Sequence, residues 1–133
     1  MSGYAKKILL LFEKLCGTYA LRNVILATTM WNQVTLQEGT DREAALKTDP
    51  EYWGWMIDKG SRVERHTNDP ESALRLIGPF VNNDSRVTLG IQHQMVNEKK
   101  TFDQTDVGLS LQTEIAKERE WSSDCDFLQA TGR

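Results

Sequence analysis

The most constraining feature of the sequence is a short apolar run at residues 23–29, which turns polar immediately afterwards. The run includes four β-branched residues: Val24, Ile25, Thr28 and Thr29. A continuous apolar run of this length predicts a strand that is buried on both faces, as in a parallel sheet. Ligands of open α/β sheets bind beyond the carboxyl ends of the strands. We therefore expect any small-molecule site to lie near Thr29 and Asn32.

Composition excludes several classes of protein. With 133 residues, 39% of them hydrophobic and 26% charged, the chain has the composition of one globular domain. The net charge of −3 argues against a nucleic-acid partner, because affinity for phosphate backbones comes from clustered Lys and Arg. Cys16 and Cys125 lack the spacing of a zinc site, and Cys16 ends a predicted helix, where the helix dipole disfavours a reactive thiolate.

The apolar run at 8–12 is too short for a secretory signal or a membrane span. It stops at Glu13 after five residues, whereas a signal peptide needs about 7–15 apolar residues and a spanning helix about 20. We expect a cytoplasmic protein with no membrane span.

Periodicity and capping residues predict a helix–strand alternation in the first two thirds of the chain. The expected elements are a helix at 4–16, a strand at 23–29, a loop at 34–40, a helix at 41–47 capped by Thr40 or Asp41, an aromatic helix from Pro50 to Gly60, a strand at 61–66 and a helix from Asn68 or Asp69 to Gly78. This order, α–β–α–α–β–α, is typical of an α/β fold with a parallel sheet.

Three segments are expected along the chain. Residues 1–84 form the sheet domain, residues 85–121 form a helical extension with a last helix from Asp106 to about Glu120, and residues 122–133 form an irregular, disordered tail. No strand precedes the first helix, although a parallel crossover needs one. We therefore expect a partial sheet with an exposed apolar edge, which favours a protein partner or self-association.

Several long stretches of the sequence resemble fungal P-loop GTPase-like proteins, which contain a G domain. The matching stretches are 12–17, 21–31, 59–62, 65–66, 71–74 and 91–98, and the resemblance covers about residues 5–120. It implies that the chain is the carboxyl half of a three-layer P-loop NTPase-like domain followed by the helical extension. The function it implies is binding of GTP.

The resemblance also implies a site for the base of the nucleotide. G domains have the pattern Asn/Thr-Lys-x-Asp at this strand end, and this chain has Thr29-Met30-Trp31-Asn32. Thr29 matches the first position, and Asn32 replaces the Asp that accepts two hydrogen bonds from guanine. Trp31 is a candidate either to stack on the base or to pack at the edge of the sheet. His66 lies at the end of the second strand, where the family's second base-binding loop begins, but the Ser-Ala-Lys pattern of that loop is absent. His66 is therefore a candidate either for the base site or for a partly exposed histidine at a strand end.

The phosphate-binding loop of the family has no counterpart in the sequence. GxxxxGK[ST] is absent, and that loop cradles the phosphates and helps to hold Mg²⁺. Hydrolysis by this chain alone is therefore not expected, and Mg²⁺ binding would need an amino-terminal half. The alternative function is a non-catalytic protein-interaction module, using the aromatic segment 52–57 or the helices after Ser85, or an inactive fragment.

Overall fold

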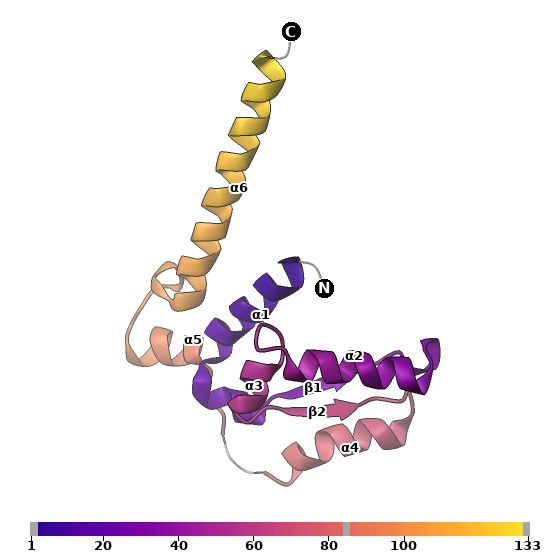
Figure 1. The fold of residues 1–133 in the computed structure, drawn as a ribbon. Helices are drawn as coiled ribbons and strands as arrows, with labels where there is room; N and C mark the ends of the chain where they lie inside the picture. Colours follow the sequence, from indigo (N-terminus) through magenta and orange to yellow (C-terminus); the bar gives the residue numbers. More distant parts are fainter. Residues whose placement is uncertain (1–2, 84–85, 132–133) are drawn as a thin grey trace. The chain divides into compact units, whose positions relative to one another are not determined.

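The structure is a computed structural model that describes residues 3–83 and 86–131. It is mostly helical, with one small parallel sheet (Figure 1). The elements are α1 (Gly3–Cys16), η1 (Thr18–Asn23), β1 (Ile25–Thr28), η2 (Trp31–Gln33), α2 (Leu36–Thr48), α3 (Gly54–Asp58), β2 (Arg62–Arg65), α4 (Pro70–Val81), α5 (Gly90–Gln92), η3 (His93–Asn97), η4 (Phe102–Gln104) and α6 (Asp106–Thr131).

The predicted order α–β–α–α–β–α and the parallel pairing are both confirmed. In the described residues the sheet contains β1 and β2 only, with Ile25 opposite Arg62 and Thr28 opposite Arg65. These strands are joined through α2 and α3, as a parallel connection requires. The chain divides into two compact units, Met1–Gly90 and Ile91–Arg133. The boundary lies six residues beyond the predicted one.

The prediction that the first strand is buried on both faces was wrong. Ala27 is exposed, and the other three residues of β1 are only half-buried. Successive side chains of a strand point to opposite faces. Leu26 packs against the core, while Ala27 points to the opposite face and is exposed.

The core of the first unit lies where α1, η1 and α3 meet. Its buried members are Cys16, Ala20, Leu21 and Met56, and Leu9, Phe12, Val24, Leu26, Trp55 and Leu89 pack against them. From the aromatic segment 52–57, Trp55 and Met56 take part in this packing, and the other residues of the segment are half-buried.

The predicted loop at 34–40 was wrong, because α2 begins at Leu36. Thr35 caps the helix: its hydroxyl accepts a hydrogen bond from the Glu38 N–H at 3.2 Å. The missed signal is Thr35-x-x-Glu38, the pattern of a helix start. Helix α4 also runs past Pro79 and ends at Val81. A proline so close to the end removes only one hydrogen bond from the last turns.

In the second unit α6 extends farther than predicted. The helix continues to Thr131, so 122–131 are helical instead of an irregular tail, and 132–133 lie outside the described residues. The sequence there has no apolar periodicity, which is why the pattern missed the helix. No helix in the described part of the chain is long and apolar enough to cross a membrane.

Candidate functional site

A pocket of about 370 Å³ lies beside the carboxyl end of β1. Its wall is formed by the end of the strand, the η2 turn, α2 and Trp53. The lining residues are Ala27, Thr28, Thr29, Met30, Trp31, Gln33, Val34, Gly39, Arg42, Glu43, Leu46 and Trp53. A small, mostly apolar hollow with a few polar groups is the usual form of a ligand site, and this one is at the lower end of the usual size range.

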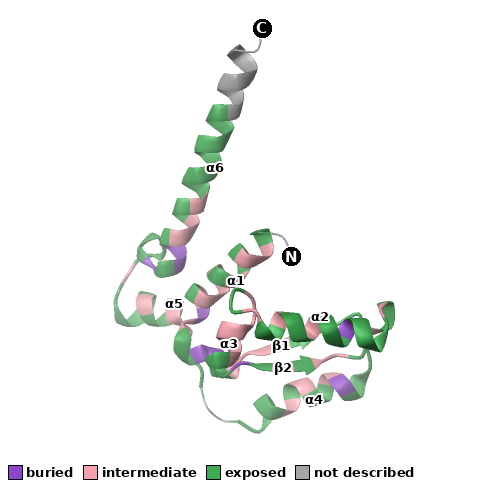
Figure 2. Ribbon diagram, in the orientation of Figure 1, coloured by how far each residue is buried: buried purple, intermediate pink, exposed green. Residues whose placement is uncertain are grey.

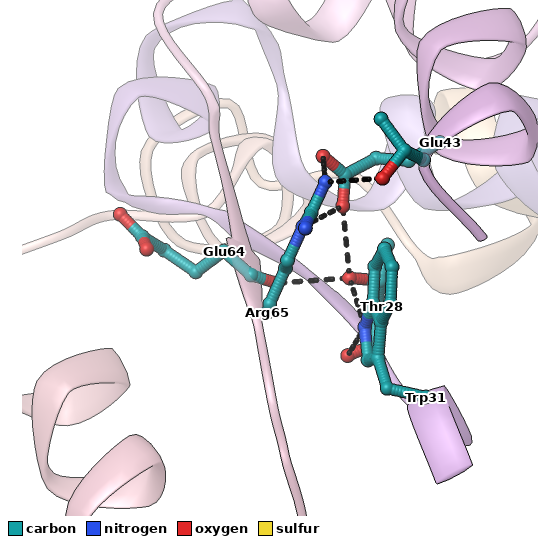
Figure 3. A network of polar contacts seen from close by, with 6 residues as sticks. Thr28, Trp31, Glu43, Glu64 and Arg65 are labelled. Atoms are coloured by element: carbon teal, nitrogen blue, oxygen red, sulfur yellow. Dashed lines mark hydrogen bonds and ion pairs between the residues drawn. The ribbon is translucent and has the colours of Figure 1, made fainter. Parts of the chain in front are cut away.

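Glu43 of α2 is a polar group of the wall, and it forms an ion pair with Arg65 of β2, which is not itself a lining residue (Figure 3). Arg65 Nε donates to Glu43 Oε2 at 2.9 Å, and Arg65 Nη2 donates to Glu43 Oε1 at 3.2 Å. This two-point contact fixes the orientation of both groups. The Glu43 side chain is only 11% exposed, compared with 37% for that of Arg65.

Thr28 connects the strand end to this pair. Its hydroxyl has one hydrogen and two nearby acceptors, Glu43 Oε2 at 3.3 Å and the Glu64 carbonyl oxygen at 3.4 Å. The same hydroxyl oxygen accepts a hydrogen bond from Trp31 Nε1 at 3.0 Å. Because Thr28 and Arg65 are paired across the sheet, the register of the strands places all these groups together.

Trp31 is held on several sides. The Arg65 guanidinium lies 4.0 Å from the centre of the Trp31 ring, a favourable cation–π distance. Gly39 lies against the edge of the ring, since a Cβ at that position would be 2.7 Å from Trp31 Cζ3. Trp31 is therefore first of all the packing residue that joins η2 to α2.

Met30 has a strained backbone beside the pocket. Its φ of 66° lies in the left-handed region, which a long side chain rarely adopts. The side chain is 65% exposed and lines the pocket. Strain of this kind is often retained at binding sites, where it places a side chain toward a ligand.

The structure brings two of the four predicted base-binding residues to the pocket. Thr29 and Trp31 line it, whereas Asn32 and His66 are not among its lining residues. Asn32 is exposed, and His66 is half-buried with its backbone N–H donating to the Thr28 carbonyl at 2.8 Å. His66 therefore extends the sheet's hydrogen bonding at the strand end.

Sequence reasoning missed Glu43 and Arg65. A signal for Glu43 was present: Gly39, Glu43 and Leu46 are spaced i, i+4 and i+7, so they share one helix face. That pattern was hidden because the predicted helix began after Gly39. Arg65 gave no local signal, because its role depends on a partner 22 residues away.

The Cys16 thiol lies in the core, away from the residues that line the pocket. Burial raises the pKa of the Cys16 thiol, so the predicted lack of thiolate reactivity is supported, with desolvation as the cause. Within residues 3–83 and 86–131, no group of three or more His, Cys, Asp or Glu residues is placed to hold a metal ion.

Comparison with known proteins adds no identification. No family model matches the chain, and no curated protein or solved structure matches it either.

Proposed function

We propose that the pocket beside Trp31 binds the base of a nucleotide, and that the base is guanine, as the sequence resemblance implies. The observation that carries the proposal is the Glu43 carboxylate in the wall of an apolar pocket at the end of a parallel strand. The edge of guanine carries N1–H and N2–H donors, which a carboxylate accepts. We also propose that β1 and β2 belong to the carboxyl half of a P-loop type of sheet.

In this proposal Glu43 takes the role that the sequence pattern suggested for Asn32. A carboxylate has about four acceptor positions. Arg65 uses two of them and Thr28 one. One position remains for guanine, so selectivity over adenine is modest. The apolar side chains of Met30, Val34 and Leu46 supply contact with the faces of the base.

Binding is expected to be weak and without hydrolysis by this chain alone. The sequence lacks the GxxxxGK[ST] loop that provides most of the affinity for phosphates. A base contact without phosphate contacts corresponds to a dissociation constant of about 1 mM, or about 4 kcal/mol of binding free energy. Mg²⁺ is not expected to change the affinity, because the ion acts through the phosphates.

The test is a titration of guanosine, GDP and adenosine into the purified chain, followed by NMR chemical shifts of the Trp31 indole N–H. We expect guanosine and GDP to bind equally, and adenosine about fivefold more weakly, from the loss of one charge-assisted hydrogen bond. Glu43→Gln replaces one acceptor oxygen by a donor, so it should reduce guanosine affinity to the adenosine level.

Asn32→Ala is the matched control, because it removes a sequence-predicted contact that lies outside the pocket lining. Its guanosine affinity should equal that of the wild type. If Asn32→Ala loses affinity and Glu43→Gln does not, the base binds at Asn32, as the sequence pattern indicated, and not at Glu43. No shift at about 10 mM guanosine would reject nucleobase binding altogether.

As a second candidate function, we propose a protein-interaction module that uses the uncovered side of the sheet and α4. The supporting observation is that α4 leaves large apolar side chains exposed, with Leu74 63%, Ile77 50% and Val81 74% exposed. Contiguous apolar surface of this kind is typical of interaction sites.

A further inference from the structure

Strand β2 has an open edge in the part of the chain that the structure describes. The Arg62 N–H donates to the Val24 carbonyl at 3.1 Å, and the His66 N–H donates to the Thr28 carbonyl at 2.8 Å. Since backbone groups alternate between the two edges of a strand, those of Val63 and Arg65 point away from β1. The described sheet has no third strand to receive them.

The side chains along this edge alternate in a specific way. Arg62 and Glu64 share the exposed face of the sheet, whereas Val63 and Arg65 are half-buried on the other face. Figure 3 shows the Glu64 side chain extending away from Arg65. Neither Arg62 nor Glu64 has an ion-pair partner among residues 3–83 and 86–131.

We propose that β2 pairs with β2 of a second copy of this chain, antiparallel and centred on Val63. A two-fold axis at Val63 places residue 62 opposite residue 64 of the second copy, and residue 64 opposite its residue 62. The dimer then contains two symmetric pairs in which Arg62 of one chain lies opposite Glu64 of the other, at a cross-strand Cβ separation of about 5 Å. The Val63 N–H and C=O groups exchange both hydrogen bonds with the same groups of the second copy.

Charge complementarity indicates that the chain that pairs with the open edge of β2 is a second copy of this protein. The order Arg62-Val63-Glu64 is complementary to itself when it is reversed, so an antiparallel copy pairs every charge with its opposite. A parallel copy in the same register would place like charges opposite each other, which is destabilising. The outer edge of β1 carries no charged residue that would set a register in this way.

This inference gives the interaction-module candidate a partner, and it is independent of nucleotide binding. Its first test is sedimentation of the full chain over a range of concentrations. We expect a reversible dimer that weakens as salt is added, because the charge pairs lie on an exposed face. A wild-type chain that remains monomeric at about 1 mM would overturn the proposal.

Charge reversal provides the sharper test. Arg62→Glu alone places Glu opposite Glu twice, and Glu64→Arg alone places Arg opposite Arg twice. Each single variant should dimerise at least about tenfold more weakly than the wild type, since both attractive pairs become repulsive. An equimolar mixture of the two variants should form a heterodimer, because every facing pair is then Glu with Arg.

Recovery in the mixture separates loss of pairing from loss of folding, because a misfolded variant cannot be rescued by its counterpart. Arg119→Glu makes the same charge change on the exposed side of α6 and should leave the dimer unchanged. If the single variants dimerise as tightly as the wild type, the edge of β2 is not the dimer interface. If the mixture fails to associate, the antiparallel register centred on Val63 is wrong. Neither result bears on guanosine binding to the pocket.

Discussion

Helices α2 and α4 differ in what holds them to the sheet. Helix α2 has a weak apolar face, yet Gly39 is buried and Glu43 reaches β2 through Arg65. Helix α4 is strongly amphipathic, but Leu74 and Val81 remain mostly exposed, and its only buried residue is Ser72 (Figure 2). Among the described residues, α2 is held by specific contacts of Gly39 and Glu43. The apolar side chains Leu74 and Val81 of α4 have no such cover and stay exposed.

Hydrogen bonds join the first turn of α4 to the segment that follows β2. Asp69 caps the helix by accepting the Ser72 N–H at 2.6 Å, and Ser72 Oγ accepts the Thr67 N–H at 3.1 Å. Amphipathicity therefore predicts that a helix forms and which face is apolar. It does not predict that the rest of the chain supplies a surface to cover that face.

The largest expected effect comes from the close approach of Gly39 to Trp31. A Cβ at Gly39 would lie 2.7 Å from Trp31 Cζ3 and 3.3 Å from Val34 Cγ2. Gly39→Val should lower the free energy of unfolding by about 3 kcal/mol through overpacking. Urea denaturation measures the change. Gly78→Ala is the control in α4, where nothing lies within 4 Å of the added Cβ, and it should add about 0.5 kcal/mol through helix propensity.

Removing the Glu43 carboxylate should have the next largest effect. Glu43→Ala leaves Arg65 without its two-point partner and removes an acceptor from Thr28. We expect a loss of about 2 kcal/mol, less than for a fully buried pair because Arg65 is partly solvated. The same change at Glu71, exposed on α4, should cost less than about 0.5 kcal/mol. Equal losses at the two positions would contradict the contrast between the helices.

The cap of α2 provides a smaller effect. Thr35→Ala removes the hydroxyl that accepts the Glu38 N–H, and should cost about 1 kcal/mol. Thermal unfolding followed by circular dichroism measures it. Thr35→Ser retains the oxygen and should behave like the wild type. If Ser and Ala destabilise equally, Thr35 does not cap the helix through its hydroxyl.

The exposed stripe of α4 should tolerate a polar residue. Leu74→Ser changes a side chain that is 63% exposed, so the stability loss should be below about 0.5 kcal/mol. Leu46→Ser at the half-buried pocket wall of α2 should cost more, about 1 kcal/mol. A larger loss for Leu74 would show that the stripe is covered in solution.

The smallest effect is a dependence on pH at the start of α4. Hydrogen bonds from the Thr67 hydroxyl and the Ser72 N–H lower the pKa of Asp69 below its usual 3.8. A lowered pKa means that the ionised form stabilises the folded state above pH 3.8, and that this stabilisation is lost as pH falls through the lowered value. Asp69→Asn should remove this slope from the unfolding free energy measured below pH 4.5. An unchanged slope would assign the acid sensitivity to other carboxyl groups.

Much of the local structure was predictable because its signals are local. Ile8, Leu11, Phe12 and Leu15 have the helical spacing that α1 confirms, and Asp69 followed by Pro70 and Glu71 marks the start of α4. The start of α2 was predictable in principle from Thr35 and Glu38. The parallel sheet was predictable from an apolar run with β-branched residues that is followed by helices and then by a second strand.

The ion pair that holds Glu43 at the pocket depended on tertiary structure. Glu43 and Arg65 are 22 residues apart, and they meet because the strand register sets Arg65 opposite Thr28 while Gly39 lets α2 approach Trp31. Sequence patterns place a residue on a face of its own element, but pairing across elements depends on register and helix distance. For the same reason the sequence by itself determined that α4 is amphipathic, and only the tertiary structure decided that its apolar face is left open.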